Sequence, residues 1–79
     1  MGTRHEQATA RQRIATRVRA LRLEREASQE ELAEQAGFHR TYVSQLERGV
    51  TNISVDNLEK LAKVLGVDVS ELLLPAKPR

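Results

Sequence analysis

The segment from residue 28 to residue 48, SQEELAEQAGFHRTYVSQLER, constrains the fold more than any other part of the chain. Ser28 and Glu31 have the spacing of a capping box, in which each side chain accepts a hydrogen bond from the other residue's backbone N–H. A helix is therefore predicted to begin there. Gly37 is predicted to end it, because glycine adopts the positive φ of a sharp turn without a Cβ clash. Ala33 is small enough for a second helix to cross closely, so the spacing predicts two helices joined by a tight turn.

The second helix of this pair combines a short apolar stripe with a polar outer face. It is predicted to begin at about His39 or Arg40 and to end at Gly49, with Val43 and Leu46 facing inward. The outer face consists of Arg40, Thr41, Ser44 and Gln45. In the DNA-reading form of a helix-turn-helix, such a face enters the major groove. The alternative is an ordinary αα-hairpin whose outer face is only solvated.

The remaining sequence continues the helical pattern. A first helix is predicted from about Gln7 to Arg25, with an inner stripe at Ile14, Val18 and Leu21. A fourth helix is predicted between Ser54 as N-cap and Gly66, and its inner residues are Leu58, Leu61, Ala62 and Leu65. Asp68 and Glu71 have the spacing of another capping box and predict a short fifth helix.

These patterns predict an all-α fold, a compact five-helix domain over residues 7–74. Residues 1–6 are expected to form a flexible basic arm and residues 75–79 a flexible tail. The chain has no cysteine, which excludes disulfides and thiolate metal sites. No apolar run approaches the roughly 20 residues of a membrane span, and residues 1–13 lack the apolar core of a signal peptide. We therefore expect a soluble, cytoplasmic protein.

Positive charge is concentrated at one end of the chain. The net charge is only +2, but the first 25 residues hold seven arginines against two glutamates. A positive segment attracts phosphates and makes binding depend on salt. The alternative is an arginine-rich helix that is merely solvated.

The sequence predicts neither an enzyme nor a metal site. Its two histidines, His5 and His39, lie far apart, and no serine occupies a strand-turn-helix nucleophile elbow. We therefore expect no catalytic residues, no metal, no cofactor and no small-molecule ligand.

Several short stretches of the motif match one known family. They are residues 28–33, Ala36-Gly37, Val43-Ser44 and Glu47-Arg48-Gly49, within a match from about Ile14 to Leu73. On these residues the chain resembles the Cro/repressor (XRE-type) helix-turn-helix family, with a lambda-repressor-like fold. Residues 39–44, 47–49 and 52–54 are similar to the controller proteins of restriction-modification systems. The resemblance implies five helices, sequence-specific binding to duplex DNA as a homodimer, and transcriptional control in a bacterium or phage.

Roles can be assigned to the motif residues. Arg40, Thr41, Ser44 and Gln45 are predicted to contact bases, because arginine can donate two bonds to guanine and glutamine can pair with adenine. Phosphate contacts are predicted for Gln29, His39, Tyr42, Arg48 and Asn52. For Asn52, a side chain bonded to its own loop backbone is the alternative. The resemblance also implies an internal salt bridge between Arg22 and Glu47, which would orient the recognition helix.

Apolar residues crowd the C-terminal end of the predicted domain: Leu65, Val67, Val69, Leu72, Leu73 and Leu74. A small domain cannot bury all of them, so we predict a homodimer interface there and an inverted-repeat operator. The alternative is a monomer in which Leu74 covers the base of the first helix. Double-stranded DNA and a second copy are the expected partners, with RNA polymerase as a further candidate. An antitoxin that also binds a toxin, and a protein-interaction module without DNA, are the competing functions.

Overall fold

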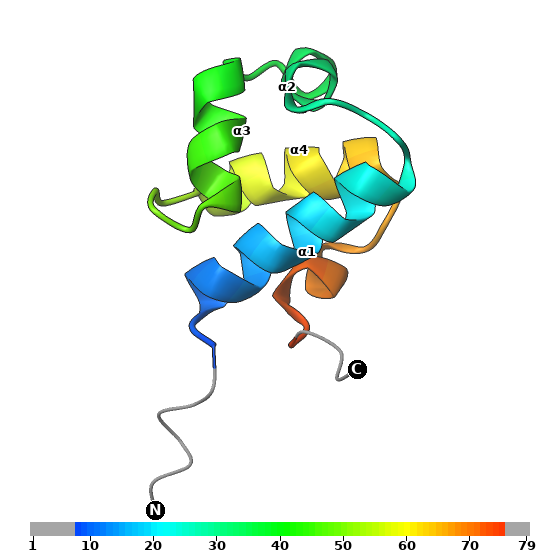
Figure 1. The fold of residues 1–79 in the computed structure, drawn as a ribbon. Coiled ribbons are helices and arrows are strands. Elements are labelled where there is room, and N and C mark those ends of the chain that lie inside the picture. The colour runs from blue at the N-terminus through cyan, green and yellow to red at the C-terminus, as the bar shows by residue number, and fades with distance from the viewer. Residues whose placement is uncertain (1–7, 76–79) are drawn as a thin grey trace, which may run out of the picture.

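The computed structural model describes residues 8–75. In chain order these residues form α1 (Ala10–Glu24), α2 (Gln29–Ala36), α3 (Arg40–Glu47), α4 (Val55–Leu65) and the 3-10 helix η2 (Val69–Leu73) (Figure 1). This part of the chain contains no strand, so the all-α prediction is confirmed for it. The predicted arm, the predicted helix start at Gln7 and residues 76–79 of the predicted tail lie outside the described residues.

Helix α1 begins later than its apolar pattern predicted. Thr9 caps it, and its Oγ1 accepts a hydrogen bond from the backbone N–H of Gln12 at 3.1 Å. Gln12 Oε1 in turn accepts from the N–H of Thr9 at 2.9 Å, which completes a capping box. The expected start near Gln7 is therefore wrong, because Thr9 has extended backbone angles and the helix follows it. The Thr-x-x-Gln spacing in the sequence contained this signal.

The motif's two helices begin and end where predicted. Ser28 Oγ accepts from the N–H of Glu31 at 2.9 Å, and Glu31 Oε1 accepts from the N–H of Ser28 at 2.8 Å. Gly37 ends α2 with a φ of 77°, a backbone conformation that side chains disfavour. His39 precedes α3 but provides no side-chain capping bond. The turn between the helices therefore depends on the glycine more than on the cap that follows it.

The last predicted helix differs in type from the prediction. It is a five-residue 3-10 helix, so the described chain has four α-helices rather than five. The expected capping box between Asp68 and Glu71 is absent from it. Asp68 Oδ2 accepts instead from the N–H and hydroxyl of Ser70, at 2.9 and 2.6 Å. The carboxylate of Glu71 lies 3.4 Å from Arg17 of α1, so this tertiary contact replaces the local bond back to Asp68.

Every helix contributes side chains to one core. The buried apolar residues are Ile14, Ala15, Val18, Leu32, Ala33, Ala36, Val43, Leu46, Leu58, Leu61, Ala62, Leu65 and Leu72. Leu21 and Phe38 are partly buried and pack against this core, and Phe38 lies in the turn between α2 and α3. Helix α3 packs against both α1 and α2, and this packing positions the motif on the rest of the domain.

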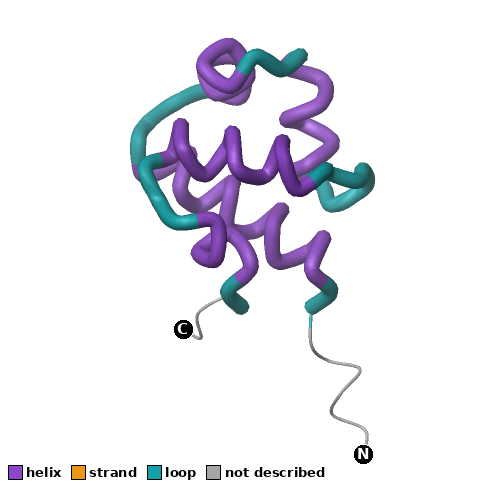
Figure 2. Tube along the Cα trace, turned by 180° about the vertical axis from the view of Figure 1, so that it is seen from behind, coloured by secondary structure: helices purple, strands orange, loops and turns teal. Residues whose placement is uncertain are grey.

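The two ends of the described chain lie at the same end of the domain, away from α2 (Figure 2). Helices α1 and η2 pack together there. Of the helices in residues 8–75, none combines the length and the apolar character that a membrane span requires.

Candidate nucleic-acid interface

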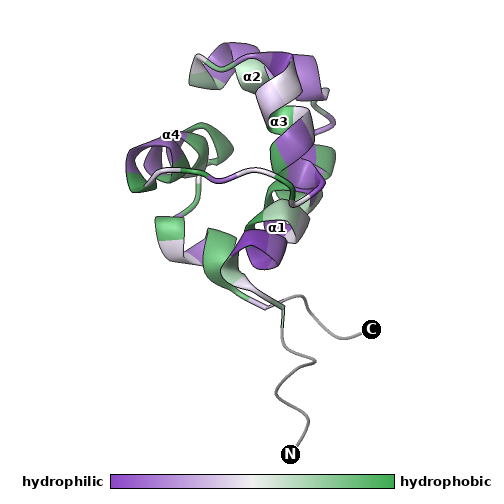
Figure 3. Ribbon diagram, turned by 90° about the vertical axis from the view of Figure 1, so that its left-hand side faces the viewer, coloured by the Kyte–Doolittle hydropathy of each residue, from purple (hydrophilic) through white to green (hydrophobic). Residues whose placement is uncertain are grey.

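Helix α3 has its polar residues on the outside of the domain. Arg40 and Thr41 in its first turn are exposed, and Ser44 and Gln45 in the next turn are half-buried. Its apolar residues face inward. Hydrophilic residues also occur along α2 and at the start of α1, which lie above and below α3 in the view of Figure 3. The predicted base-reading residues are thus accessible on one helix, while their contact with bases stays a prediction.

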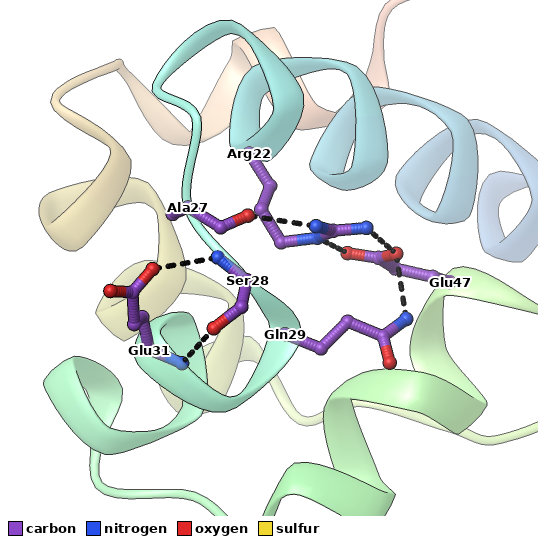
Figure 4. A network of polar contacts seen from close by, with 6 residues as sticks. All are labelled: Arg22, Ala27, Ser28, Gln29, Glu31 and Glu47. Atoms are coloured by element: carbon purple, nitrogen blue, oxygen red, sulfur yellow. Dashed lines mark hydrogen bonds and ion pairs between the residues drawn. The ribbon is translucent and has the colours of Figure 1, made fainter.

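A buried ion pair holds the C-terminal end of α3 against α1. Arg22 Nε donates to Glu47 Oε2 at 2.6 Å and Arg22 Nη2 donates to Oε1 at 2.9 Å (Figure 4). The Glu47 side chain is only 2% exposed. Arg22 Nη1 also donates to the carbonyl of Ala27 at 2.8 Å, and Gln29 Nε2 donates to Glu47 Oε1 at 3.0 Å. The pair that the resemblance implied thus connects α1, the α1–α2 turn, the start of α2 and the end of α3.

This network changes the acidity of both charged groups. Burial by itself would raise the pKa of Glu47, but hydrogen bonds from Arg22 and Gln29 outweigh it, helped by the positive charges of Arg22 and Arg19. The pKa of Glu47 is therefore below its ordinary value. The hydrogen bond to Glu47 raises the pKa of Arg22, against the opposing effect of its own burial. Both groups are charged at neutral pH.

We expect the pKa of Glu47 to make the free energy of unfolding depend on pH. A carboxyl with a lowered folded-state pKa stabilises the fold fully above its unfolded pKa, about 4.3 for glutamate. This stabilisation is lost as the pH falls through the folded value. Urea titrations at a series of pH values from neutral downward measure the effect, and Glu47→Gln should remove this component. Asp68 also has a lowered pKa, caused by hydrogen bonds from Ser70, so the difference between wild type and variant is the decisive quantity.

An unchanged difference in unfolding free energy between wild type and Glu47→Gln across this acidic range would contradict the prediction. It would mean that the carboxyl of Glu47 titrates alike in the folded and unfolded chains.

Three of the predicted phosphate contacts lie at helix ends. Gln29 is the first residue of α2, and its side-chain amide already donates to Glu47. An anion could therefore bind here to the free backbone N–H groups of this first turn, and not to the side chain of Gln29. His39 and Arg48 are both exposed, one before α3 and the other at its C-cap. All three stay predicted phosphate contacts.

Tyr42 and Asn52 meet at the loop after α3. The ring of Tyr42 lies edge-on to Phe38, with 5.0 Å between ring centroids. Its hydroxyl donates to the carbonyl of Asn52 and accepts from Asn57 Nδ2, each at 3.4 Å. The side-chain Oδ1 of Asn52 accepts from Arg11 of α1, and among the described residues it has no bond to its own loop backbone. Intramolecular contacts therefore occupy the Tyr42 hydroxyl and orient the loop that carries Asn52.

Two arginines of α1, Arg13 and Arg17, have roles that the sequence did not reveal. Arg13 Nη1 donates to the carbonyl of Leu73 at 3.3 Å, and Arg17 Nε donates to the carbonyl of Glu71 at 3.0 Å. Arg22 is engaged with Glu47. These cations therefore bind acceptors on η2 and α3, so the positive segment is neither a uniform phosphate-binding surface nor simply solvated. Nothing in the sequence spacing signals contacts between residues more than 50 positions apart.

The apolar C-terminal end is only partly exposed. Leu65 and Leu72 are buried in the domain core, and Val67 and Val69 are half-buried against it. Leu73 and Leu74 are 38% and 43% exposed. The predicted interface therefore needs a correction: Leu65 and Leu72 fill the interior of this copy and cannot form a contact surface. Leu73 and Leu74 remain as its candidates, with the two valines at the edge.

Comparison with known proteins identifies this arrangement. Residues 18–72 match a family model described as helix-turn-helix. The control protein C.BamHI of Bacillus amyloliquefaciens is 50% identical over 58 residues, which are 72% of each chain. The hypothetical transcription factor NHTF of Neisseria meningitidis is 48% identical over 66 residues, 84% of this chain and 62% of that protein, and thus less than two thirds of its length. Its crystal structure superimposes with a TM-score of 0.82, covering 85% of this chain and 77% of that one.

The structure of a third relative has been determined in complex with DNA. The transcriptional regulator SinR of Bacillus subtilis is 44% identical over 61 residues, which are 76% of this chain and 55% of SinR. A crystal structure of SinR in complex with DNA aligns with a TM-score of 0.72 and 44% identity, over 76% of this chain and 97% of that one. The family model covers more than half of the chain, and the C.BamHI match covers more than two thirds. The chain belongs to the XRE-type helix-turn-helix family.

Proposed function

We propose that the protein is a sequence-specific regulator of transcription that binds double-stranded DNA as a homodimer on an inverted-repeat operator. The observation that carries this proposal is the exposed first turn of α3, with Arg40 and Thr41 on a helix whose other end is fixed through Glu47. A reading helix must be both accessible and firmly oriented, because base contacts require hydrogen-bond geometry. Relatives described as control proteins and transcriptional regulators support the same function.

Base reading is assigned to the outer residues of α3. Arg40 is the strongest candidate, because its planar guanidinium can donate to guanine O6 and N7 together. Thr41 can offer its methyl group to thymine, while Ser44 and Gln45 lie one turn further along. These four side chains would select the operator sequence.

Phosphate binding is assigned to the ends of α2 and α3. The first turn of α2 at Gln29 would bind one strand through its N–H groups, and Arg48 and Asn52 would bind beyond the other end of α3. His39, which precedes α3, would add a weaker contact, and Tyr42 would do so only by turning its hydroxyl from the carbonyl of Asn52 to the phosphate. Such contacts set the position of the protein on the duplex and carry little sequence information.

Within this function, we favour a controller of a restriction-modification operon. C.BamHI and the control protein C.SmaI of Serratia marcescens, 43% identical over 60 residues, support this assignment. Activation would require a contact with RNA polymerase in addition to operator binding. We place the protein in a bacterial or phage-infected cytoplasm, because relatives come from bacteria and a Bacillus phage and the proposed target is DNA.

Selection from genomic DNA fragments with the purified protein tests the proposal. We expect enrichment of a short inverted repeat, with half-sites centred about one DNA turn apart. Enrichment upstream of a methyltransferase and an endonuclease gene would favour the controller. Recovery of fragments without any common sequence would contradict sequence-specific regulation.

Arg40→Ala is expected to weaken binding to the selected operator by about 1 to 3 kcal/mol and to relax preference at one base pair per half-site. The fold should survive, because the Arg40 side chain is exposed and makes no hydrogen bond to another side chain or backbone group among the described residues. Titrations against operators with single base substitutions measure both effects. Arg25→Ala is the matched control, since it also removes an exposed arginine, but from the C-terminal end of α1 and not from α3. If Arg40→Ala retained the wild-type base preference, the assignment would be wrong.

A further inference from the structure

One arginine at the start of α1 contacts the loop that follows the recognition helix. Arg11 lies in the first turn of α1, and Asn52 lies in the loop between α3 and α4. Arg11 Nη2 donates a hydrogen bond to Asn52 Oδ1, and both residues are exposed. They are 41 positions apart in the sequence, so the contact arises only from the packing of α1 beside α3.

This contact fixes which end of the Asn52 amide is available. Its oxygen accepts from Arg11, so its Nδ2 group is the end that remains to donate. The backbone carbonyl of Asn52 accepts from the hydroxyl of Tyr42, and this hydrogen bond holds the loop against α3. Arg11 keeps further N–H donors beyond the one used here, because a guanidinium carries five. The pair therefore combines a positive charge and several N–H donors at the loop that follows α3.

The surroundings leave both side chains accessible. A hollow of about 270 Å³ adjoins them, and it is lined by both residues together with Ala10, Ile14, Leu46, Thr51 and Ile53. Because Arg11 and Asn52 border this open space and are not enclosed in the core, their donors can reach a ligand at the surface without moving buried residues. In Figure 3 the start of α1 lies directly below α3.

We propose that Arg11 and Asn52 together form a binding site for one phosphate of the DNA backbone. Arg11 supplies the charge and turns the amide of Asn52 so that its Nδ2 donates to the same phosphate. The inference rests on the proposed DNA-binding function and adds α1 to the elements that contact the duplex. Its ligand is a phosphate diester of duplex DNA, and the site contributes affinity without base selection.

The dependence of binding on salt tests this site. The probe is a DNA duplex of mixed sequence, and binding is followed by fluorescence anisotropy over a range of salt concentrations. Arg11→Gln should weaken binding about fivefold to tenfold at 0.1 M salt and should lower the slope of log K against log salt by about 0.9 per bound protomer. Arg25→Gln removes the same charge from the far end of α1 and should leave the slope unchanged. Equal slopes for the two variants would overturn the proposal.

A second variant separates phosphate binding from a purely structural contact. In Asn52→Asp the new carboxylate still accepts from Arg11, so the loop remains attached to α1. The variant loses the Nδ2 donor and gains a negative charge, so we expect weaker DNA binding at an unchanged or higher melting temperature. Binding equal to that of wild type would overturn the proposed site and leave the contact a structural one.

The same measurements distinguish this site from the proposed function. A wild-type protein that binds the mixed-sequence duplex and the selected operator equally well would contradict sequence-specific regulation, while the salt slopes would still decide on Arg11. A wild-type protein that prefers its operator, with equal slopes for Arg11→Gln and Arg25→Gln, would overturn the phosphate site alone. Absence of any DNA binding would overturn both.

Discussion

Replacing Glu47 by alanine is expected to lower the free energy of unfolding by about 3 to 5 kcal/mol, because it leaves a buried charge without its partner. Arg22 would keep only the carbonyl of Ala27 as an acceptor, and the amide of Gln29 would lose its own acceptor. A domain of this size has a total stability of only about 0.05 to 0.15 kcal/mol per residue. Loss of one carboxylate should therefore leave a substantial fraction of the molecules unfolded at 37 °C.

A matched control exists in the same structure. Glu71 also pairs with an arginine of α1, but at 3.4 Å and with a side chain that is 45% exposed. Arg17 keeps the carbonyl of Glu71 as an acceptor, and ion pairs of exposed carboxylates contribute about 0 to 1 kcal/mol, so Glu71→Ala should cost little. Urea unfolding followed by circular dichroism measures both variants. If Glu47→Ala cost no more than Glu71→Ala, the buried network would have no special role in stability.

A double variant separates stability from orientation. With Arg22→Leu and Glu47→Leu together, no buried charge is left unpaired, and similar replacements in other proteins are often neutral. We therefore expect the double variant to be more stable than Glu47→Ala alone. It should still bind its operator less well than wild type, because the hydrogen bonds that fix the end of α3 are gone. A double variant with wild-type affinity would show that packing alone orients the recognition helix.

Local signals in the sequence predicted most of the fold. Helix starts are set by local hydrogen bonds, at Ser28 with Glu31 and at Ser54. Helix ends are set by glycines with positive φ, at positions 37, 49 and 66. Such interactions depend on spacing alone, so reading the spacing is enough. The capping box of Thr9 and Gln12 before α1 belongs to the same class, since its spacing is present in the sequence, although the apolar periodicity predicts an earlier start near Gln7.

Long-range competition explains what could not be predicted. Asp68 and Glu71 have the spacing of a capping box, but the carboxylate of Glu71 pairs with Arg17, which is 54 positions away. The hydrogen-bond partners of the α1 arginines likewise depend on how α1 packs against η2 and the loop after α3. Spacing within a segment contains no information on such partners. The ion pair of Arg22 with Glu47 is predicted only by the resemblance to the helix-turn-helix family, and not by the spacing of the two residues.

In the candidate site, too, local patterns were predictable from the sequence and long-range contacts were not. The sequence identified the outer residues of α3, because periodicity separates inward from outward positions on a helix. It did not predict that Gln29 donates to Glu47 or that Asn52 accepts from Arg11. Each is a contact between side chains on different helices or loops. Predicting the polar face of a helix is thus easier than predicting the hydrogen bonds that hold it.

Leu73→Glu combined with Leu74→Glu is expected to convert the proposed dimer into a monomer. Both leucines are exposed at the C-terminal end of η2, and the Leu73 carbonyl is held by Arg13 of α1. In a two-fold interface, the introduced glutamates of one protomer would lie close to those of the other and would lose hydration. Both effects disfavour association. Analytical ultracentrifugation at micromolar concentration measures the effect. Leu23→Glu is the control, because Leu23 is similarly exposed at the far end of α1 and should leave the dimer intact.

The same variant should bind an inverted repeat at least about 100-fold more weakly, because two linked recognition helices gain that much or more from simultaneous binding. Its affinity for an isolated half-site and its helical circular dichroism should equal those of wild type, since neither leucine belongs to the buried core. This combination separates loss of the dimer from loss of the fold. A wild type that is monomeric at micromolar concentration would contradict the interface. So would a Leu73→Glu, Leu74→Glu variant that dimerises as wild type does, because the two exposed leucines would then lie outside the contact.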